Sequence, residues 1–450
     1  MSSHQAIERP TDITMPSTGM WAKLPLIAGA IGVIGTGFTI AMMFGEHKDR
    51  AFFSYLFAFM TVLSIALGAL AFVLIQHVTR AGWSAIVRRV AEAAMATLPL
   101  FALLFIPIAV LGFHSLYPWS HESDAILEAK RWWLGASNGN GSGQKFYVRA
   151  VIFFGIWTLL SQLLWRWSVK QDKLVDDKVA RDALSDKLQT LSAGGVFLFA
   201  LSLSFAAIDW LMSLQPHWYS TMYGVYYFAG AILGFYAFLA LTLMALQKGG
   251  MITTALTTEH YHDVGKFVFG HTVFWAYISF CQFMLIWYAN IPEETEFYMV
   301  RMTGGWQYIS LAFPIIHFFM PFLYLVSRHV KRSRLGLAIG ASWILVVHVI
   351  DLYWNVLPNF GAHGAEHAVH AEAAAKGVHG AVDAAHGAAV EAAAAVGHHA
   401  PGFHVDLLDI TAFVGIVGLF LATFAWILKK NAVVCIGDPR LPESLRHENY

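Results

Sequence analysis

The chain has 450 residues, of which 57% are hydrophobic and only 13% are charged. Soluble globular domains contain about 25% charged residues, so an ordinary soluble enzyme or binding domain is excluded. The formal net charge is zero and no basic patch interleaves with aromatic residues, so no nucleic-acid partner is expected. The composition therefore predicts an all-α integral membrane protein that crosses the bilayer several times.

Apolar runs of about 20 residues, the length that a helix needs to cross a bilayer, recur along the chain. They predict about ten transmembrane helices. The runs are Leu24 to Phe44, Phe53 to Val78, Val90 to Phe113, Tyr147 to Trp167, Leu191 to Ser213, Tyr219 to Leu246, Gly265 to Ile291, Trp306 to Val326, Leu335 to Leu357 and Leu407 to Leu428.

Lys and Arg collect in every second connection, which predicts that these connections and both termini are cytoplasmic. The first helix begins after a polar stretch without a cleavage site, so no signal peptide is expected. The predicted organisation is a cytoplasmic segment 1–23, a peripheral helix 24–44, a four-helix bundle 53–213, a second four-helix bundle 219–357, an Ala/His-rich periplasmic insert 361–400, a last transmembrane helix 405–429 and a cytoplasmic tail 430–450.

Two local patterns predict how segments pack. In the first span Ala28, Gly32 and Thr36 recur at four-residue intervals, and such a stripe of small residues allows another helix to approach closely. Between Val169 and Gln189 charges of both signs alternate among helix formers, which indicates an exposed helix, a docking surface or a solvated linker. Of these, we favour the solvated linker.

The chain is expected to bind no redox cofactor of its own. Cys281 and Cys435 cannot supply the four thiolates of an iron–sulfur cluster, and there is no CxxCH motif for covalent haem. The histidines within the spans lie at different depths, so no pair for haem b emerges. In the insert, His363, His367 and His370 have the helical spacing of a zinc or copper site, but a chance spacing in an Ala/His-rich segment is the favoured reading.

Ionisable residues inside the spans are candidates for a proton path, because hydrocarbon does not tolerate them unless they face protein or water. His271 and Gln282 lie eleven residues apart and therefore on one face of the seventh span. At its inner end, His262 and Asp263 align with that face. A solvated loop and satisfied core side chains are the structural alternative.

The eighth and ninth spans carry the remaining proton-path candidates. His317 lies mid-span, and Pro321 cannot donate to its carbonyl, so we expect a kink there. His348 and Asp351 are three residues apart on one helix face and could form a relay station or a structural pair.

A second group of polar and aromatic residues is expected at the outer ends of the spans. His114, Asp209, Trp210 and His217 could together hold the head group of a quinol and accept its protons. The alternative is an aspartate that caps the outer turn beside an aromatic belt.

Two blocks of this sequence carry a family resemblance: AAIDWLMSLQPHWYSTMYGVYYFAGA at 206–231 and EHYHDVGKFVFGHTVFWAYISFCQFMLIWYANIPEETEFY at 259–298. They resemble the ActF class of polysulfide-reductase-type (NrfD-like) membrane proteins in bacterial alternative complex III, a quinol:cytochrome c oxidoreductase. The resemblance extends over the spans from about Leu24 to Leu428 and excludes the Ala/His-rich insert.

The resemblance implies a cofactor-free subunit of a respiratory electron-transport complex in the bacterial cytoplasmic (inner) membrane. The implied partners are a homologous NrfD-like membrane subunit, an iron–sulfur subunit, multihaem c-type cytochromes and a terminal oxidase, with quinone or menaquinone and lipid nearby. Haem c and the iron–sulfur clusters would belong to those partners. A proton path or a structural role is expected for this subunit, and a secondary transporter or a pure scaffold is the rival interpretation.

Overall fold

The computed structural model describes residues 10–121, 125–134, 143–375 and 402–448. All regular structure in these residues is helical, and ten helices are long and apolar enough to cross a membrane. The prediction of an all-α protein with about ten transmembrane helices is therefore confirmed.

Most spans are single helices, but the third and eighth are broken into shorter pieces. The helices of the spans are α1 (Gly19–Met42), α2 (Lys48–Val78), α3 (Arg88–Met95), α4 (Leu98–Leu104), α5 (Ile106–Val110), α8 (Gln144–Gln171), α9 (Lys178–Trp210), α10 (Tyr223–Lys248), α11 (Thr258–Ala289), α13 (Trp306–Phe313), η5 (Pro314–Phe319), α14 (Met320–Leu325), α16 (Arg334–Ala375) and α18 (Leu407–Lys429). The connections contain η1 (Gly82–Ala85), α6 (Phe113–Leu116), η2 (Pro118–Ser120), α7 (Ala125–Leu134), η3 (Asp172–Leu174), η4 (Met212–Leu214), α12 (Pro292–Val300), α15 (Arg328–Arg332) and α19 (Leu441–Leu445).

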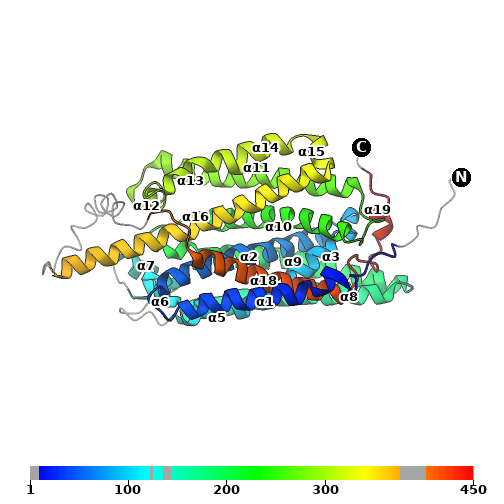
Figure 1. Cartoon of the computed structure of the whole chain (residues 1–450), viewed down its shortest axis with the longest axis horizontal. Helices are drawn as coiled ribbons and strands as arrows, with labels where there is room; N and C mark the ends of the chain where they lie inside the picture. The colour runs from blue at the N-terminus through cyan, green and yellow to red at the C-terminus, as the bar shows by residue number, and fades with distance from the viewer. Residues whose placement is uncertain (1–9, 122–124, 135–142, 376–401, 449–450) are drawn as a thin grey trace.

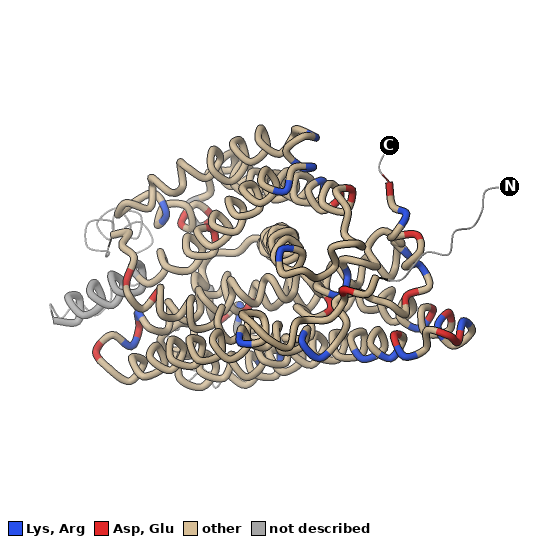
Figure 2. The backbone as a smooth tube through the Cα atoms, turned by 45° about the vertical axis from the view of Figure 1, so that its right-hand side comes forward, with Lys and Arg blue, Asp and Glu red and all other residues tan. Residues whose placement is uncertain are grey.

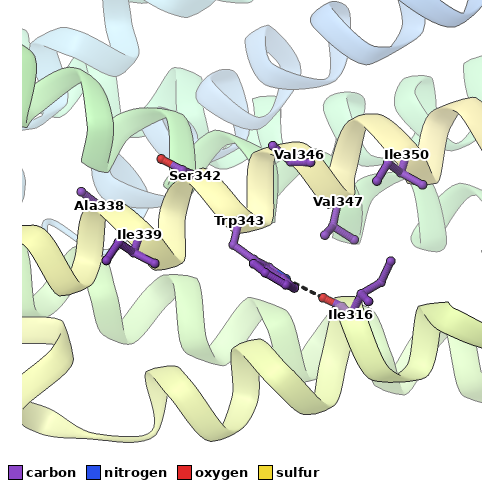
Figure 3. A pocket seen from close by; sticks show the side chains of 8 residues that line it. All are labelled: Ile316, Ala338, Ile339, Ser342, Trp343, Val346, Val347 and Ile350. Atoms are coloured by element: carbon purple, nitrogen blue, oxygen red, sulfur yellow. Dashed lines mark hydrogen bonds between the residues drawn. The ribbon is translucent and has the colours of Figure 1, made fainter.

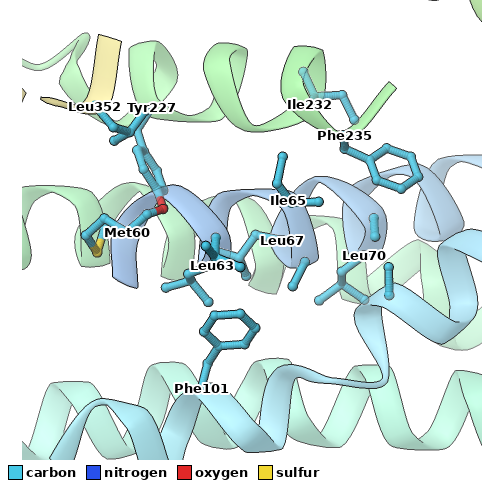
Figure 4. Packing of buried hydrophobic residues seen from close by; sticks show 14 of the residues in the cluster. Met60, Leu63, Ile65, Leu67, Leu70, Phe101, Tyr227, Ile232, Phe235 and Leu352 are labelled. Carbon is cyan, nitrogen blue, oxygen red and sulfur yellow. The ribbon is translucent and has the colours of Figure 1, made fainter. Parts of the chain in front are cut away.

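Helix α2 is the centre of the molecule. Nearly all of its side chains are buried, because it packs against α3, α9, α10, α16 and α18. Figure 4 shows part of this packing, with Leu63 and Leu70 of α2 between Phe101 on one side and Phe235 of α10 on the other. A helix that is apolar on all sides is typical of such a buried position.

The other spans surround α2 in two groups (Figure 1). Helices α3, α4, α8 and α9 pack on one side of α2, and helices α10 and α16 pack on the other, with α11 and α14 beyond them. The first helix, α1, makes its main contact with the last span, α18. The two groups are therefore joined through α2 and α10, and α1 with α18 lies against their flank.

Helices α1 and α18 approach closely through small residues, as the small-residue stripe predicts. Ala28, Gly32 and Thr36 are all buried. A Cβ atom added at Gly415 of α18 would lie 2.4 Å from the backbone nitrogen of Thr36, and one at Gly32 would lie 2.5 Å from the nitrogen of Leu419. Only glycine leaves room for backbone contact at this distance.

The basic connections gather at one end of the molecule, where most Lys and Arg side chains lie (Figure 2). The N-terminal segment reaches this end too, because the carbonyls of Asp12 and Ile13 accept hydrogen bonds of 2.8 Å from the amides of Ile252 and Val433. This common end agrees with the even number of spans. Its assignment to the cytoplasm stays a prediction from the charge pattern.

The region between Val169 and Gln189 is more regular than a solvated linker. Helix α8 continues to Gln171, η3 follows, and α9 begins at Lys178, so only a short turn separates two long helices. Asp177 caps α9 by accepting a hydrogen bond of 3.0 Å from the amide of Ala180. The preference for a linker was therefore wrong, because helix propensity and a good N-cap extend both spans beyond their apolar parts.

Substitution of Gly415 by alanine should loosen the α1–α18 pair. Its methyl group would meet the backbone of Thr36, and overpacking of this kind costs about 1–3 kcal/mol. We expect a lower midpoint of thermal unfolding in detergent. Gly37→Ala is the matched control, because a Cβ atom there meets nothing within 4 Å. Equal midpoints for the two variants would contradict the close packing.

Candidate functional site

A cluster of buried polar side chains lies between α10, α11 and α16 and is built around Asp351. Tyr226 donates its hydroxyl hydrogen to Oδ1 of Asp351, the Asn355 amide donates to the same oxygen at 3.2 Å, and Nε1–H of Trp275 donates to Oδ2 at 3.1 Å. Tyr223 extends the chain by donating to Oδ1 of Asn355 at 3.1 Å. All three donors to the carboxylate are neutral groups.

His348 lies one turn from Asp351 and bonds to α2. Its Nε2 is 2.8 Å from Oγ of Ser64, and that hydroxyl donates its one hydrogen to the carbonyl of Thr61 at 2.6 Å. When the Ser64 hydroxyl donates to Thr61, Nε2 of His348 is the donor to Oγ of Ser64, and the lone pair of this tautomer is on Nδ1. Nδ1 is buried and makes no hydrogen bond to the protein, so it is free to accept a proton.

Two glycines of α10 make room for the His348 ring. A Cβ atom added at Gly234 would lie 2.9 Å from Cδ2 of His348, and one at Gly230 would lie 3.3 Å from Cε1. The helix backbone therefore forms one wall of the imidazole site. Any larger residue at Gly234 would displace the ring.

His317 lies beside this cluster in the broken eighth span. The segment Pro314–Phe319 forms a π-helix, which is the expected distortion next to Pro321. The imidazole is fully buried and stacks on the indole of Trp275, with ring centroids 3.5 Å apart. Neither ring nitrogen bonds to the protein. Since Trp275 also donates to Asp351, it links His317 to the carboxylate.

The π-helix is fixed from its other side by α16. Nε1–H of Trp343 donates to the carbonyl of Ile316 at 2.7 Å (Figure 3). An apolar groove of about 580 Å³ surrounds this contact. Its lining residues are Ile316, Ala338, Ile339, Ser342, Trp343, Val346, Val347 and Ile350.

Arg301 closes the outer end of the cluster and was not recognised from the sequence. It is 1% exposed and donates to the carbonyl of Trp354 at 3.1 Å and to that of Asn355 at 2.9 Å. Pro358 has no N–H, so the carbonyl of Trp354 lacks its usual helical donor and Arg301 replaces it. Burial lowers the pKa of Arg301 to about 10, so the guanidinium is still charged at pH 7.

The two predicted α11 residues lie on either side of Trp275 along the helix. His271 donates from Nδ1 to the carbonyl of Phe267 at 2.8 Å, and its ring lies 4.9 Å from that of Tyr236. Gln282 is buried nearer the outer end and accepts a hydrogen bond of 3.0 Å from Ser220. Neither bonds directly to Asp351, so a continuous path along α11 would need water between these groups.

At the inner end of α11, Asp263 has two partners. Lys266 lies 2.5 Å from its Oδ1, and His447 of the C-terminal segment bonds to its Oδ2. The neighbouring His262 is buried, and its Nδ1 makes no hydrogen bond to the protein. The structure thus brings His262 and Asp263 to one end of α11, more than three helical turns from Trp275.

Asp209 and Trp210, two of the outer residues suggested for quinol binding, make their contacts with other side chains of the protein. The carboxylate of Asp209 accepts three hydrogen bonds. Two come from Arg149, from Nε at 2.5 Å and from Nη2 at 3.0 Å, and one comes from Nε1–H of Trp133 at 2.9 Å. Trp210 is fully buried among aromatic rings, the nearest being Phe105 with centroids 4.5 Å apart. Arg149 of α8 and Asp209 of α9 form an ion pair that connects the two helices.

The other two residues of that group have separate surroundings. Nδ1 of His114 lies 3.1 Å from Oγ of Ser120, and its ring contacts that of Phe113. The carbonyl of His217 accepts from Lys130 at 3.4 Å. Among the described residues, the bonds of His114 lead to Ser120 and those of Asp209 lead to Arg149 and Trp133, so the quinol-binding group stays a prediction.

No cluster of three or more metal-ligating side chains occurs among the described residues. The backbone of α16 extends through His363, His367 and His370, but their side chains lie outside the described part of the structure. The metal-site prediction in the insert stays a prediction.

Two buried charge networks were missed because each depends on at least one pair of residues that lie far apart in the sequence. Arg50 of α2 pairs with Asp409 of α18, which also accepts from Ser54 at 2.6 Å and Tyr353 at 2.9 Å. At the inner end, a second network joins α3, α8, η3 and the C-terminal segment. Its members are Arg88, Arg89, Glu92, Ser168, Asp172 and Asp438.

No protein-family model matches the chain, and a search of curated proteins finds no match. The chain is a multi-pass helical membrane protein by the length and hydropathy of its helices. Its assignment to a family and to a reaction therefore depends on the residues above.

Substitution of Arg301 by alanine should destabilise the outer end of the cluster. The buried carbonyl of Trp354 would lose the donor that replaces the missing N–H of Pro358, and an unsatisfied buried group of this kind costs about 1–3 kcal/mol. We expect a lower midpoint of thermal unfolding than for Arg328→Ala, which changes an exposed arginine. An unchanged midpoint for Arg301→Ala would show that these hydrogen bonds do not stabilise the fold.

Cys435 should be chemically inert in the folded protein. Burial raises the pKa of its thiol to about 12, in spite of the nearby Arg89 and Arg88, which act in the opposite direction. The reactive thiolate therefore forms only far above neutral pH. Alkylation of Cys435, measured by peptide mass spectrometry, should stay slow at both pH 7 and pH 9, because only a small fraction of the thiol is ionised, and should become fast after denaturation. Fast labelling of the native chain would contradict this.

Proposed function

We propose that the chain is a cofactor-free membrane subunit of a respiratory quinol:cytochrome c oxidoreductase of the alternative complex III type, in the bacterial cytoplasmic membrane, and that it carries a proton path. The subunit class rests on the sequence blocks 206–231 and 259–298. The proton path rests on the buried cluster around Asp351. This assignment places haem c and iron–sulfur clusters in partner subunits.

The observation that supports a proton path most strongly is the unpaired imidazole nitrogens. Nδ1 of His348 has a free lone pair, and neither nitrogen of His317 bonds to the protein. Buried polar atoms almost always have partners, so exceptions call for a functional explanation. A proton carrier needs a lone pair that a proton can reach, and an imidazole nitrogen without a donor from the protein offers one.

The groups next to these histidines can continue the path. Asp351, Tyr226, Asn355 and Tyr223 form a hydrogen-bonded chain towards the outer end of α10. A cavity beside them leaves about 10 Å³ for the centre of a water molecule, which is roughly the space that one water needs. Towards the inner end, His271 and Asp263 are the ionisable groups in line.

Quinone binding at Asp209 has less support than a proton path. The carboxylate already accepts three hydrogen bonds from Arg149 and Trp133. A carboxylate has about four acceptor sites, so only one is left for a quinol hydroxyl. We therefore assign Asp209 a structural role in the proposed complex and place quinol oxidation in the homologous subunit.

The rival functions predict different partners. A secondary transporter would purify alone and without colour, whereas the proposed subunit should co-purify with c-type cytochromes, an iron–sulfur subunit and a second NrfD-like subunit. Purification of the tagged chain from native membranes, with optical spectra and mass spectrometry, separates these outcomes. A colourless protein without partners would overturn the proposed complex.

Substitution of Asp351 by asparagine should abolish the path while keeping the size of the side chain. We expect quinol-driven proton uptake in vesicles that contain the whole complex to fall by roughly 100-fold, the usual contribution of a positioned proton-transfer group. The control is Asp186→Asn, because Asp186 lies in an exposed pair with Arg80. Normal uptake by an assembled Asp351→Asn complex would exclude this path, and a scaffold would then be the better account.

A further inference from the structure

The C-terminal segment forms a strap across the inner end of the molecule. We define the strap as residues 433–447. The amide of Gly437 donates to Oδ1 of Asp172 at 3.0 Å, Asp438 pairs with Arg88, and Oγ of Ser444 donates to the carbonyl of Trp83 at 2.6 Å. These contacts hold the strap against α3, η3 and η1. The strap is therefore part of the folded inner surface and not a free tail.

The strap ends at His447, whose imidazole lies at the inner end of α11, beside the predicted proton-path residue Asp263. Nε2 of His447 bonds to Oδ2 of Asp263. The side chain of His447 is 23% exposed, whereas that of Asp263 is 7% exposed. His447 thus connects a buried carboxylate to the surrounding water. The other oxygen of Asp263 is occupied by Lys266 at 2.5 Å.

The neighbouring histidines His260 and His262 lack the combination of exposure to water and a hydrogen bond to Asp263. His260 is fully buried, with Nδ1 near Oγ of Thr257 at 2.9 Å and Nε2 near Oγ of Ser444 at 3.3 Å. His262 is buried as well, and no hydrogen bond joins it to Asp263 among the described contacts. His447 combines exposure with a direct bond to the carboxylate.

We propose that His447 is the residue that transfers protons from water at the inner end to Asp263. This proposal rests on the proposed proton path. His447 takes a proton from a hydronium ion, which leaves a water molecule, and becomes an imidazolium. The Nε2–H bond then breaks as an O–H bond forms on Oδ2 of Asp263, which leaves a neutral imidazole and a carboxylic acid. The strap positions the imidazole of His447, because Ser444, three residues before His447, is held in place by its hydrogen bond to the carbonyl of Trp83.

The test is proton uptake by the whole complex in vesicles, with the variant His447→Ala. We expect uptake to slow by roughly 100-fold, because a positioned proton donor is lost. Imidazole added to the medium should restore much of the rate, since a small imidazole can carry the proton in place of the side chain. Arg446→Ala is the matched control, because Arg446 is exposed on the adjacent position of the strap.

Three results would overturn the proposal. Unchanged uptake by His447→Ala would show that protons enter elsewhere. Slow uptake that imidazole does not restore, together with a lower unfolding midpoint, would show that His447 only holds the strap in place. If the unmodified complex takes up no protons, the proposed function itself fails, and this outcome is distinct because the variant then has no activity to lose.

Discussion

The structure depends on one constraint, which is that hydrocarbon offers no hydrogen-bond partner to a polar group. Each polar side chain in the spans must therefore find its partner within the bundle. The two helix groups around α2 meet this demand by pairing residues from different helices, such as Arg50 with Asp409 and Arg149 with Asp209. The unpaired nitrogens of His317 and His348 depart from this rule, as do several other buried polar atoms, such as Nε1 of Trp210. What distinguishes the two histidines is that they lie beside the hydrogen-bonded cluster around Asp351.

The parts of the fold that follow from local sequence could be predicted. Apolar length identified the ten spans found among the described residues. The spacing of Gly32 and its neighbours indicated the close contact with α18, and Pro321 indicated the distortion around His317. These features depend on helix geometry and on the presence or absence of a side chain or an N–H. Such properties belong to a residue and its near neighbours in the sequence.

Pairings between distant segments could not be predicted. Nothing near Arg301 in the sequence indicates that it replaces the donor missing at Pro358, and the tail around His447 has no property that places it on Asp263. Asp209 could be recognised as buried, but its partner Arg149 lies 60 residues earlier. Within the candidate site, residue identity was therefore easier to predict than connectivity, and the connectivity decides which groups can exchange protons.

The central claim is that Asp351 exchanges protons with water although it is buried. Infrared spectra of the purified chain at stepped pH test it most directly, with the carboxylic-acid C=O band of Asp351 assigned by its loss in Asp351→Asn. The account predicts that this band changes reversibly with pH while the protein stays folded. A band that is constant or absent at every pH at which the fold persists would contradict it.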